Sequence, residues 1–201
     1  MKESIIKTII SGGFIADMKG IGRWTVLRTG AALFKADVPA CVISFEGDIK
    51  EVSDFTRLLA DRFGPDIIIT ADKIDSKKLA KMAVRSGVRA AFCPADKKIA
   101  SYLRKKGVAV FIDAKGKEDI SFAENFSAEA VRISRNLKTT LPKIKKADSL
   151  DDLKAPFSGE YIPMFSSPVI TKEILETKDY DKIETLSKEI IENFLEENKN
   201  V

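Results

Sequence analysis

The chain contains no histidine and only two cysteines among its 201 residues. The lack of histidine excludes Ser-His-Asp triads, His-ligated metals and imidazole acid–base catalysis, so a general base must be a carboxylate, a lysine or a tyrosine. Cys41 and Cys93 are too few for a disulfide framework or a zinc site. They fall at opposite ends of two apolar runs, which disfavours a bridge and predicts two small buried side chains.

Long apolar runs are missing too, and none reaches membrane-spanning length. Residues 1–10 lack the continuous apolar core of a signal peptide, so we expect a cytoplasmic protein that binds no membrane. The net charge of +4 is mild and does not demand a nucleic-acid partner. The densest basic segment, residues 138–146, predicts a solvated face, with phosphate binding as the alternative.

What the sequence does contain is a repeated unit between Val38 and Lys117. Each unit has a short apolar run, a polar turn and an amphipathic segment, and the units recur at roughly twenty to twenty-five residues, close to the shortest βα repeat of a barrel. This rhythm predicts parallel strands joined by crossover helices. The runs are residues 40–45, 66–70, 89–93 and 108–112.

The flanking segments are less regular. Residues 14–18 predict a first strand and residues 118–137 a helix, and a short strand is expected near Ile144. Residues 161–165 predict a weak strand at an edge or a bulge, because Pro163 lies inside it. We expect one α/β domain over residues 1–201, a parallel α/β barrel whose C-terminal third is degenerate or incompletely closed. The alternative is an open doubly wound parallel sheet.

Charged residues follow the predicted strands, where α/β proteins place their chemistry. The candidate catalytic residues are Asp17, Glu46, Asp72, Lys73, Asp113 and Lys115. A desolvated lysine among them could form a Schiff base, and clustered carboxylates can serve as acid and base or bind a divalent metal such as Mg²⁺. The alternative is that acidic residues after strands cap the next helix, which suits Asp48, Asp75 and Asp96.

The repeat also resembles a known family, the 2-keto-3-deoxy-6-phosphogluconate and 4-hydroxy-2-oxoglutarate (KDPG/KHG) aldolases. In that family a strand reads E-I-T-x-R, and later units read G-A-G-T, A-x-x-x-G-A, V-S-P and V-P. The matching segments here are Val42-Ile43-Ser44-Phe45-Glu46, Thr70-Ala71-Asp72-Lys73, Ala83-Val84-Arg85-Ser86-Gly87-Val88, Phe92-Cys93-Pro94 and Gly107-Val108-Ala109-Val110. The resemblance covers about two thirds of the chain. It rests on the order and spacing of the strand and helix segments rather than on identical active-site residues.

The resemblance implies a class I aldolase barrel, a homotrimer, and a keto acid or sugar phosphate as substrate. Ser166 and Ser167 resemble its phosphate-binding strand. The family's glutamate and arginine, however, fall on Val42 and Glu46. Its Schiff-base lysine opens a K-x-F-P-A-E segment whose nearest match here places Glu124 at the lysine. A carboxylate cannot form an imine, so the family's mechanism does not transfer directly.

The sequence therefore leaves two functions open. The first is a divergent lyase on a 2-keto acid or sugar phosphate, with Lys73 or Lys115 as the amine. The second is a non-catalytic barrel that binds a small molecule or a protein, which the departures from the family's Glu, Arg and Lys favour.

Overall fold

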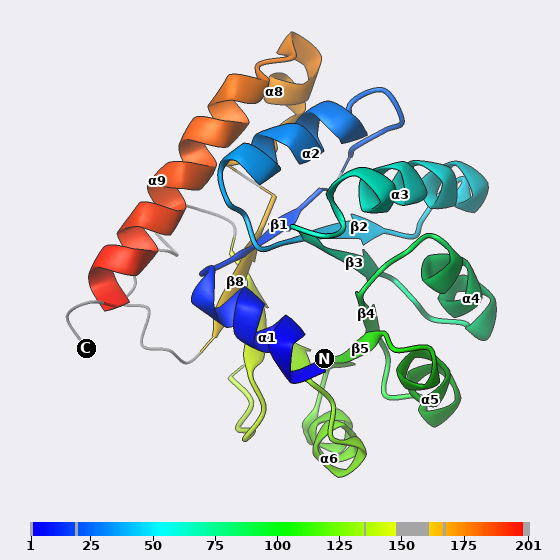
Figure 1. Cartoon of the computed structure of the whole chain (residues 1–201). Coiled ribbons are helices and arrows are strands. Elements are labelled where there is room, and N and C mark those ends of the chain that lie inside the picture. The colour runs from blue at the N-terminus through cyan, green and yellow to red at the C-terminus, as the bar shows by residue number, and fades with distance from the viewer. Residues whose placement is uncertain (1, 19, 135, 148–160, 167, 199–201) are drawn as a thin grey trace.

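Eight parallel strands close into a barrel in sequence order in the computed structural model (Figure 1). The structure describes residues 2–18, 20–134, 136–147, 161–166 and 168–198. Each strand pairs with the next, and β8 pairs with β1, so the barrel is confirmed and the open doubly wound sheet is wrong. The strands are β1 (Ile15–Asp17), β2 (Ala40–Ser44), β3 (Ile68–Asp72), β4 (Ala90–Cys93), β5 (Ala109–Ala114), β6 (Ala130–Ile133), β7 (Lys143–Lys146) and β8 (Ile162–Phe165).

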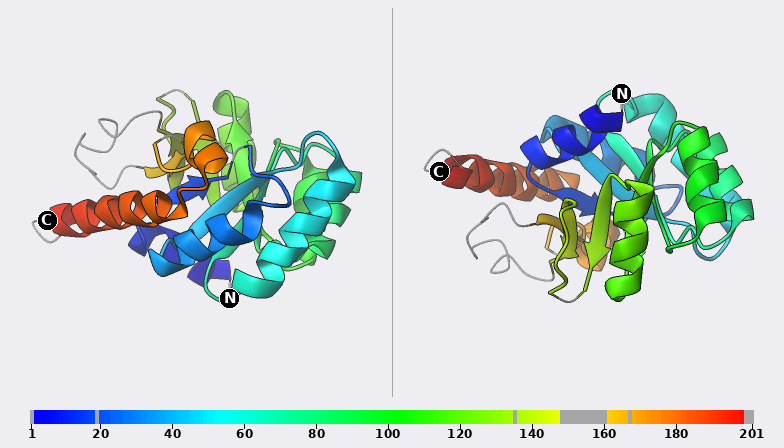
Figure 2. Two further views of the ribbon diagram at one scale, coloured as in Figure 1. Left: turned by 90° about the horizontal axis from the view of Figure 1, so that it is seen from above. Right: turned by 90° about the horizontal axis from the view of Figure 1, so that it is seen from below.

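All the described helices except α1 surround this barrel, as the two views of Figure 2 show. Their apolar faces pack on the strands because each amphipathic segment carries apolar residues at helical spacing. The described helices are α1 (Lys2–Ser11), α2 (Val26–Lys35), α3 (Ile49–Phe63), α4 (Lys77–Arg85), α5 (Lys97–Lys105), α6 (Lys117–Phe126), α8 (Lys172–Thr177) and α9 (Tyr180–Asn198). None of the described helices is long and apolar enough to cross a membrane.

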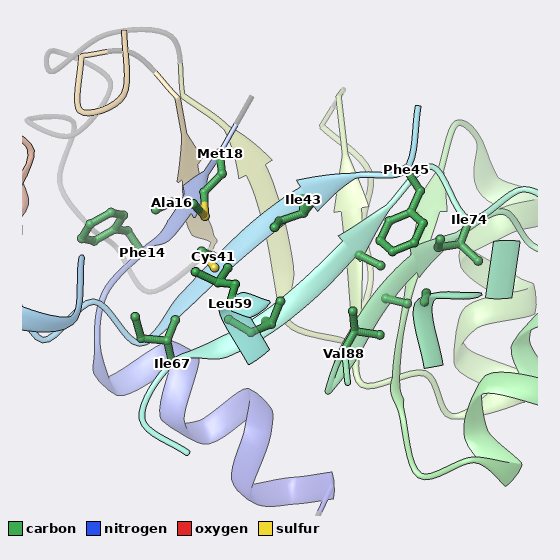
Figure 3. Packing of buried hydrophobic residues seen from close by; sticks show 14 of the residues in the cluster. Phe14, Ala16, Met18, Cys41, Ile43, Phe45, Leu59, Ile67, Ile74 and Val88 are labelled. Carbon is green, nitrogen blue, oxygen red and sulfur yellow. The ribbon is translucent and has the colours of Figure 1, made fainter. Parts of the chain in front are cut away.

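The core has two layers because successive strand residues point to opposite faces. Outward residues pack under the helices, and Figure 3 shows this layer around Phe14, Cys41 and Phe45. Inward residues such as Phe92 and Phe111 fill the barrel interior. Ile5 and Ile9 of α1 join that inner cluster, so α1 closes one end of the barrel, and Figure 1 shows it at the centre of the ring of helices.

The C-terminal third differs most from expectation. Residues 118–137 were predicted to be one helix, but α6 ends at Phe126 and β6 follows. Ser127 ends α6 in the left-handed conformation with φ 55°, which turns the chain into the strand. β7 contains Ile144, which confirms the short strand predicted there.

Pro163 lies in a strand with neighbours on both sides, so the predicted edge or bulge is wrong. β8 pairs with β1 only through Met164 and Phe165, and that ladder therefore begins after the proline and needs no N–H from it. The capping roles of Asp48 and Asp96 are confirmed by their hydrogen bonds from Lys50, Glu51, Lys98 and Ile99. Asp75 is not a cap, because the hydroxyl of Ser76 fills that position.

Candidate functional site

A ring of polar side chains occupies the C-terminal end of the barrel. Each lies two residues beyond a buried interior residue and therefore shares its inward orientation. Every strand except β4, where Pro94 stands, contributes one. The ring consists of Asp17, Ser44, Asp72, Asp113, Arg132, Lys146 and Ser166.

Arg132 organises the floor of this mouth. Its Nε and Nη2 donate to both carboxylate oxygens of Asp113 at 2.5 and 2.8 Å, and Nη2 also donates to Oδ1 of Asp72 at 2.7 Å. The guanidinium carbon lies 4.3 Å from the ring centroid of Phe92, directly above the apolar interior. This geometry combines a bidentate ion pair with a cation–π contact, a combination for which lysine is no substitute.

Asp17 forms a second pair on the other side of the mouth. Its Oδ2 lies 3.5 Å from Nζ of Lys146, and the side chain of Asp17 is only 10% exposed whereas that of Lys146 is 53% exposed. Burial raises the pKa of Asp17, and the charge of Lys146 only partly opposes this effect. A buried carboxyl with a raised pKa beside an accessible amine is suited to proton transfer.

Burial also raises the pKa of Asp113, against the lowering effect of Arg132. The backbone N–H of Lys73 donates to Oδ1 of Asp72 at 2.7 Å, and Lys73 itself adopts a left-handed conformation with φ 62°. The Lys73 side chain is 55% exposed, with Nζ 3.9 Å from a carboxylate oxygen of Glu46. A non-glycine residue in this conformation is uncommon, so the turn after β3 is closely defined.

These groups surround a cavity of about 480 Å³. Four predicted site residues line it, namely Asp72, Lys73, Asp113 and Lys115. Asp17 belongs to the same mouth through Lys146, which also lines the cavity. The barrel mouth thus brings five of the predicted residues together.

Glu46 is placed differently. It borders a separate hollow of about 300 Å³ with Ser44, Asp48 and Glu51. It meets the mouth through Lys73 and through the hydroxyl of Ser44, which donates to its carboxylate at 2.9 Å. The backbone carbonyl of Ser166 accepts a hydrogen bond from the N–H of Ile170 at 2.6 Å. Ser166 does not line the cavity, and Ser167 lies outside the described residues. Within those residues, no three acidic or cysteine side chains are arranged to hold a metal ion.

Sequence reasoning missed Arg132, Lys145 and Lys146. Arg132 was assigned to a helix, although the repeat length counted from β5 falls on its strand. The two lysines belong to the basic segment 138–146, for which the sequence predicts a solvated face with phosphate binding as the alternative. β7 carries Lys146 inward two residues beyond the buried Ile144. Nζ of Lys145 lies 5.3 Å from the ring centroid of Tyr161. Arg132 lies two residues after the buried Ala130, and Lys146 lies two residues after the buried Ile144. Because every second residue of a strand points to the same face, this spacing indicates that both side chains point inward.

Glu124, matched in sequence to the family's lysine, lies on α6 away from the cavity. Its carboxylate accepts hydrogen bonds from the hydroxyl of Thr139 at 2.9 Å and the N–H of Thr140 at 3.0 Å. These bonds lower the pKa of this carboxylate. Glu124 thus anchors the segment before β7, and the sequence match does not identify the mouth residue that corresponds to the lysine.

The closed ring of eight parallel strands and the helices around it define a TIM-type α/β barrel. No protein-family model matches the chain, and no curated protein does. Among solved structures, the KDPG aldolase from Legionella pneumophila, captured with pyruvate as a covalent carbinolamine intermediate, has a TM-score of 0.78 at 11% identity over 94% of this chain and 98% of its own. The 2-keto-3-deoxy-6-phosphogluconate aldolase of Zymomonas mobilis with 3-phosphoglycerate has a TM-score of 0.77 at 11% identity, covering 94% of this chain and 96% of its own.

The resemblance predicted from the sequence is thus confirmed as a similarity of fold. At sequence identities this low, the similarity shows a shared fold. It does not show a shared reaction, because a reaction depends on the residues of the site rather than on the barrel.

Proposed function

We propose that the mouth binds a small organic anion, a 2-keto acid or a sugar phosphate, and that the protein is a carbon–carbon lyase acting on it. The observation that carries the proposal is the charge of the cavity lining. Five cationic side chains, Lys73, Lys115, Arg132, Lys145 and Lys146, surround two carboxylates, those of Asp72 and Asp113. A cavity with this excess of positive charge favours carboxylate and phosphate groups.

Lys146 is the amine best placed for chemistry. It projects from a strand rather than a loop, and Asp17 lies beside it. A neutral Nζ would attack the carbonyl carbon of the keto acid, with a proton passing to the carbonyl oxygen. Loss of water from the carbinolamine would leave an imine, and Asp17 would supply or accept the protons that these steps require. As the carbon–carbon bond breaks, the hydroxyl on the departing carbon would lose its proton to a base and become an aldehyde, and the electron pair of the broken bond would pass to the protonated imine and give an enamine. Protonation and hydrolysis of the enamine would release the second product and the free amine.

The structures similar in fold support this ligand class. One was captured with pyruvate and another with 3-phosphoglycerate. Lys73 and Lys115 are the alternative amines, but both lie on turns that follow strands rather than on a strand. The cytoplasmic location and the trimer implied by the resemblance belong to this proposal.

A non-catalytic binding protein is the second candidate, and the Arg132 network favours it. Arg132 engages Asp72 and Asp113 through three hydrogen bonds, so both carboxylates are already occupied. A mouth held in this way could receive an anion on its lysines without having a free base on its floor.

Reductive trapping distinguishes the two functions. The protein is incubated with pyruvate and borohydride, and its mass and modified peptide are determined. A lyase of the proposed kind gains one reduced pyruvyl group on Lys146, and the Lys146→Arg variant gains none. Lys188→Arg is the matched control. Lys188 lies on α9, forms an ion pair with Glu184 and does not line the cavity. Calorimetric binding of pyruvate and 3-phosphoglycerate without any adduct would instead identify the binding protein.

A further inference from the structure

Two neighbouring helices on the outside of the barrel, α4 and α5, form a strongly basic face. Residues 76–107, which contain both helices, hold ten lysine and arginine residues and a single acidic residue, Asp96. The whole chain holds 34 basic and 30 acidic residues, so the remainder of the chain has a net negative charge. The mild net charge of the chain is therefore an average over one basic region and an acidic remainder.

The helical period turns these charges toward solvent. Lys77, Lys81 and Arg85 recur every four residues of α4, and Lys97 and Lys105 are eight residues apart on α5. The opposite sides of both helices pack into the core. We call the exposed cations the α4–α5 basic face, which consists of Lys77, Lys78, Lys81, Arg85, Lys97, Lys98, Lys105 and Lys106.

Neighbouring side chains do not neutralise this face. None of its eight cations forms an ion pair with another residue that the structure describes. Arg89 and Arg104, the other two cations of the segment, differ because they are partly buried and donate hydrogen bonds to backbone carbonyls. The helices lie side by side in Figure 1, and Nζ of Lys77 on α4 lies 6.0 Å from the ring centroid of Tyr102 on α5. Like charges gathered on one surface repel each other, and a bound polyanion would remove this repulsion.

We propose that the α4–α5 basic face binds the sugar–phosphate backbone of a nucleic acid duplex. Phosphate contacts require positive charge, and they carry no sequence information. The two rows of cations are about 10 Å apart, the usual distance between packed helices, and the major groove of B-DNA is about 12 Å wide. The rows therefore match the phosphates on the two sides of a groove. The face lies on the outside of the barrel, so the proposal is independent of the reaction in the mouth.

Other polyanions fit this face less well. The large apolar residues exposed in the described part of the chain lie on α1, α2, α3 and α9 and before α2, and none lies on α4 or α5. An acidic protein would need an apolar centre in its interface, where lysine is depleted. A membrane holds a protein stably through an apolar anchor together with basic charge. A single strand would need exposed aromatic rings for its bases to stack on, and Tyr102 is partly buried beside Lys77.

Fluorescence anisotropy of a labelled short DNA duplex tests the proposal. The dissociation constant should rise steeply between about 50 and 200 mM salt, because each phosphate contact releases counterions. Either strand alone should bind more weakly than the duplex. Lys81→Glu/Lys98→Glu should weaken duplex binding at least about tenfold and reduce the salt dependence by about one power of the salt concentration per lysine. Ser101→Glu should also weaken binding, because Ser101 is exposed on α5 and the variant adds a carboxylate to the face while keeping every lysine.

Lys7→Glu/Lys182→Glu is the matched control, since it makes the same change in net charge at exposed positions of α1 and α9 and should bind as the wild type does. Circular dichroism melting confirms that each variant is folded. Equal weakening by the control and by Lys81→Glu/Lys98→Glu overturns the proposal, and so does a wild-type protein that does not bind the duplex at about 50 mM salt. Vesicles of phosphatidylserine and phosphatidylcholine, and separately polyglutamate, serve as competitors at equal charge concentration and should not displace the duplex. Displacement by either one overturns the proposal in favour of a membrane or an acidic polypeptide.

Discussion

Nη2 of Arg132 lies 2.7 Å from Oδ1 of Asp72, so a side chain of β6 meets a side chain of β3 across the barrel mouth. Only 15% of the Arg132 side chain and 9% of the Asp72 side chain are exposed. The pair forms a polar floor between the cavity above and the aromatic interior below, where Phe92 lies under the guanidinium. Buried ion pairs add little net stability, yet the loss of one partner is costly because a charge is left unpaired.

Arg132→Met should therefore destabilise the fold by about 3–5 kcal/mol, since it leaves the buried Asp72 and the partly buried Asp113 without their cation. Urea unfolding measures this loss. The variant Arg132→Met/Asp72→Asn/Asp113→Asn is the control and should recover most of the stability, because it removes the unpaired charges together with their partner. A triple variant no more stable than Arg132→Met would show that the loss comes from packing against Phe92 instead.

Asp17→Asn should make the protein more stable at neutral pH. Burial raises the pKa of Asp17 above its ordinary value of 3.8, so the folded state holds this proton more tightly than the unfolded state does. The resulting penalty is absent below pH 3.8, grows as the pH rises through the folded pKa and is complete above it. Unfolding midpoints of the two proteins should coincide near pH 3.5 and separate toward pH 7 in favour of the variant. Midpoints that separate in favour of the wild type would mean that the ion pair with Lys146 outweighs burial.

The sequence predicts the first five strands because each is a short apolar run followed by a turn and an amphipathic helix. It fails at β6, where the strand is four residues long and its third residue is Arg132, a charge that a helical pattern accommodates as readily. The partners of Arg132 lie 19 and 60 residues away in sequence, so nothing local indicates that this charge is satisfied. Lys146 is equally hard to recognise, because it is one lysine in a run of basic residues. Only its place two residues after the buried Ile144 shows that it points inward. Asp72, Lys73, Asp113 and Lys115 were found because they follow clear strands.

Ile9→Ala tests the role of α1 in closing the barrel. Ile9 is fully buried in the inner cluster, and its truncation should cost about 2–5 kcal/mol through lost burial and a new cavity. Its neighbour Ile10 is 43% exposed, and Ile10→Ala should cost less than about 1 kcal/mol. Urea denaturation of the two variants compares one helix position inside the barrel with one outside it. Equal losses would mean that α1 contributes only through helix formation.

Anion affinity should depend on Lys146 more than on Lys73 or Lys115. Lys146 projects from β7 and lies 3.5 Å from a carboxylate oxygen of Asp17, whereas Lys73 and Lys115 lie on turns that follow strands. A charge-assisted hydrogen bond contributes about 1.5–3 kcal/mol, so Lys146→Ala should weaken binding of 3-phosphoglycerate roughly 10- to 100-fold. Lys73→Ala or Lys115→Ala should weaken it only a few-fold, because a lysine on a turn is held less firmly than one on a strand and contributes little beyond general attraction. Calorimetric titrations at low and at physiological salt measure both effects, and the smaller losses should shrink further as salt screens the exposed lysines. If Lys115→Ala weakens binding as much as Lys146→Ala does, the anion lies over the turn after β5, and the Asp17–Lys146 pair has no privileged part in its recognition.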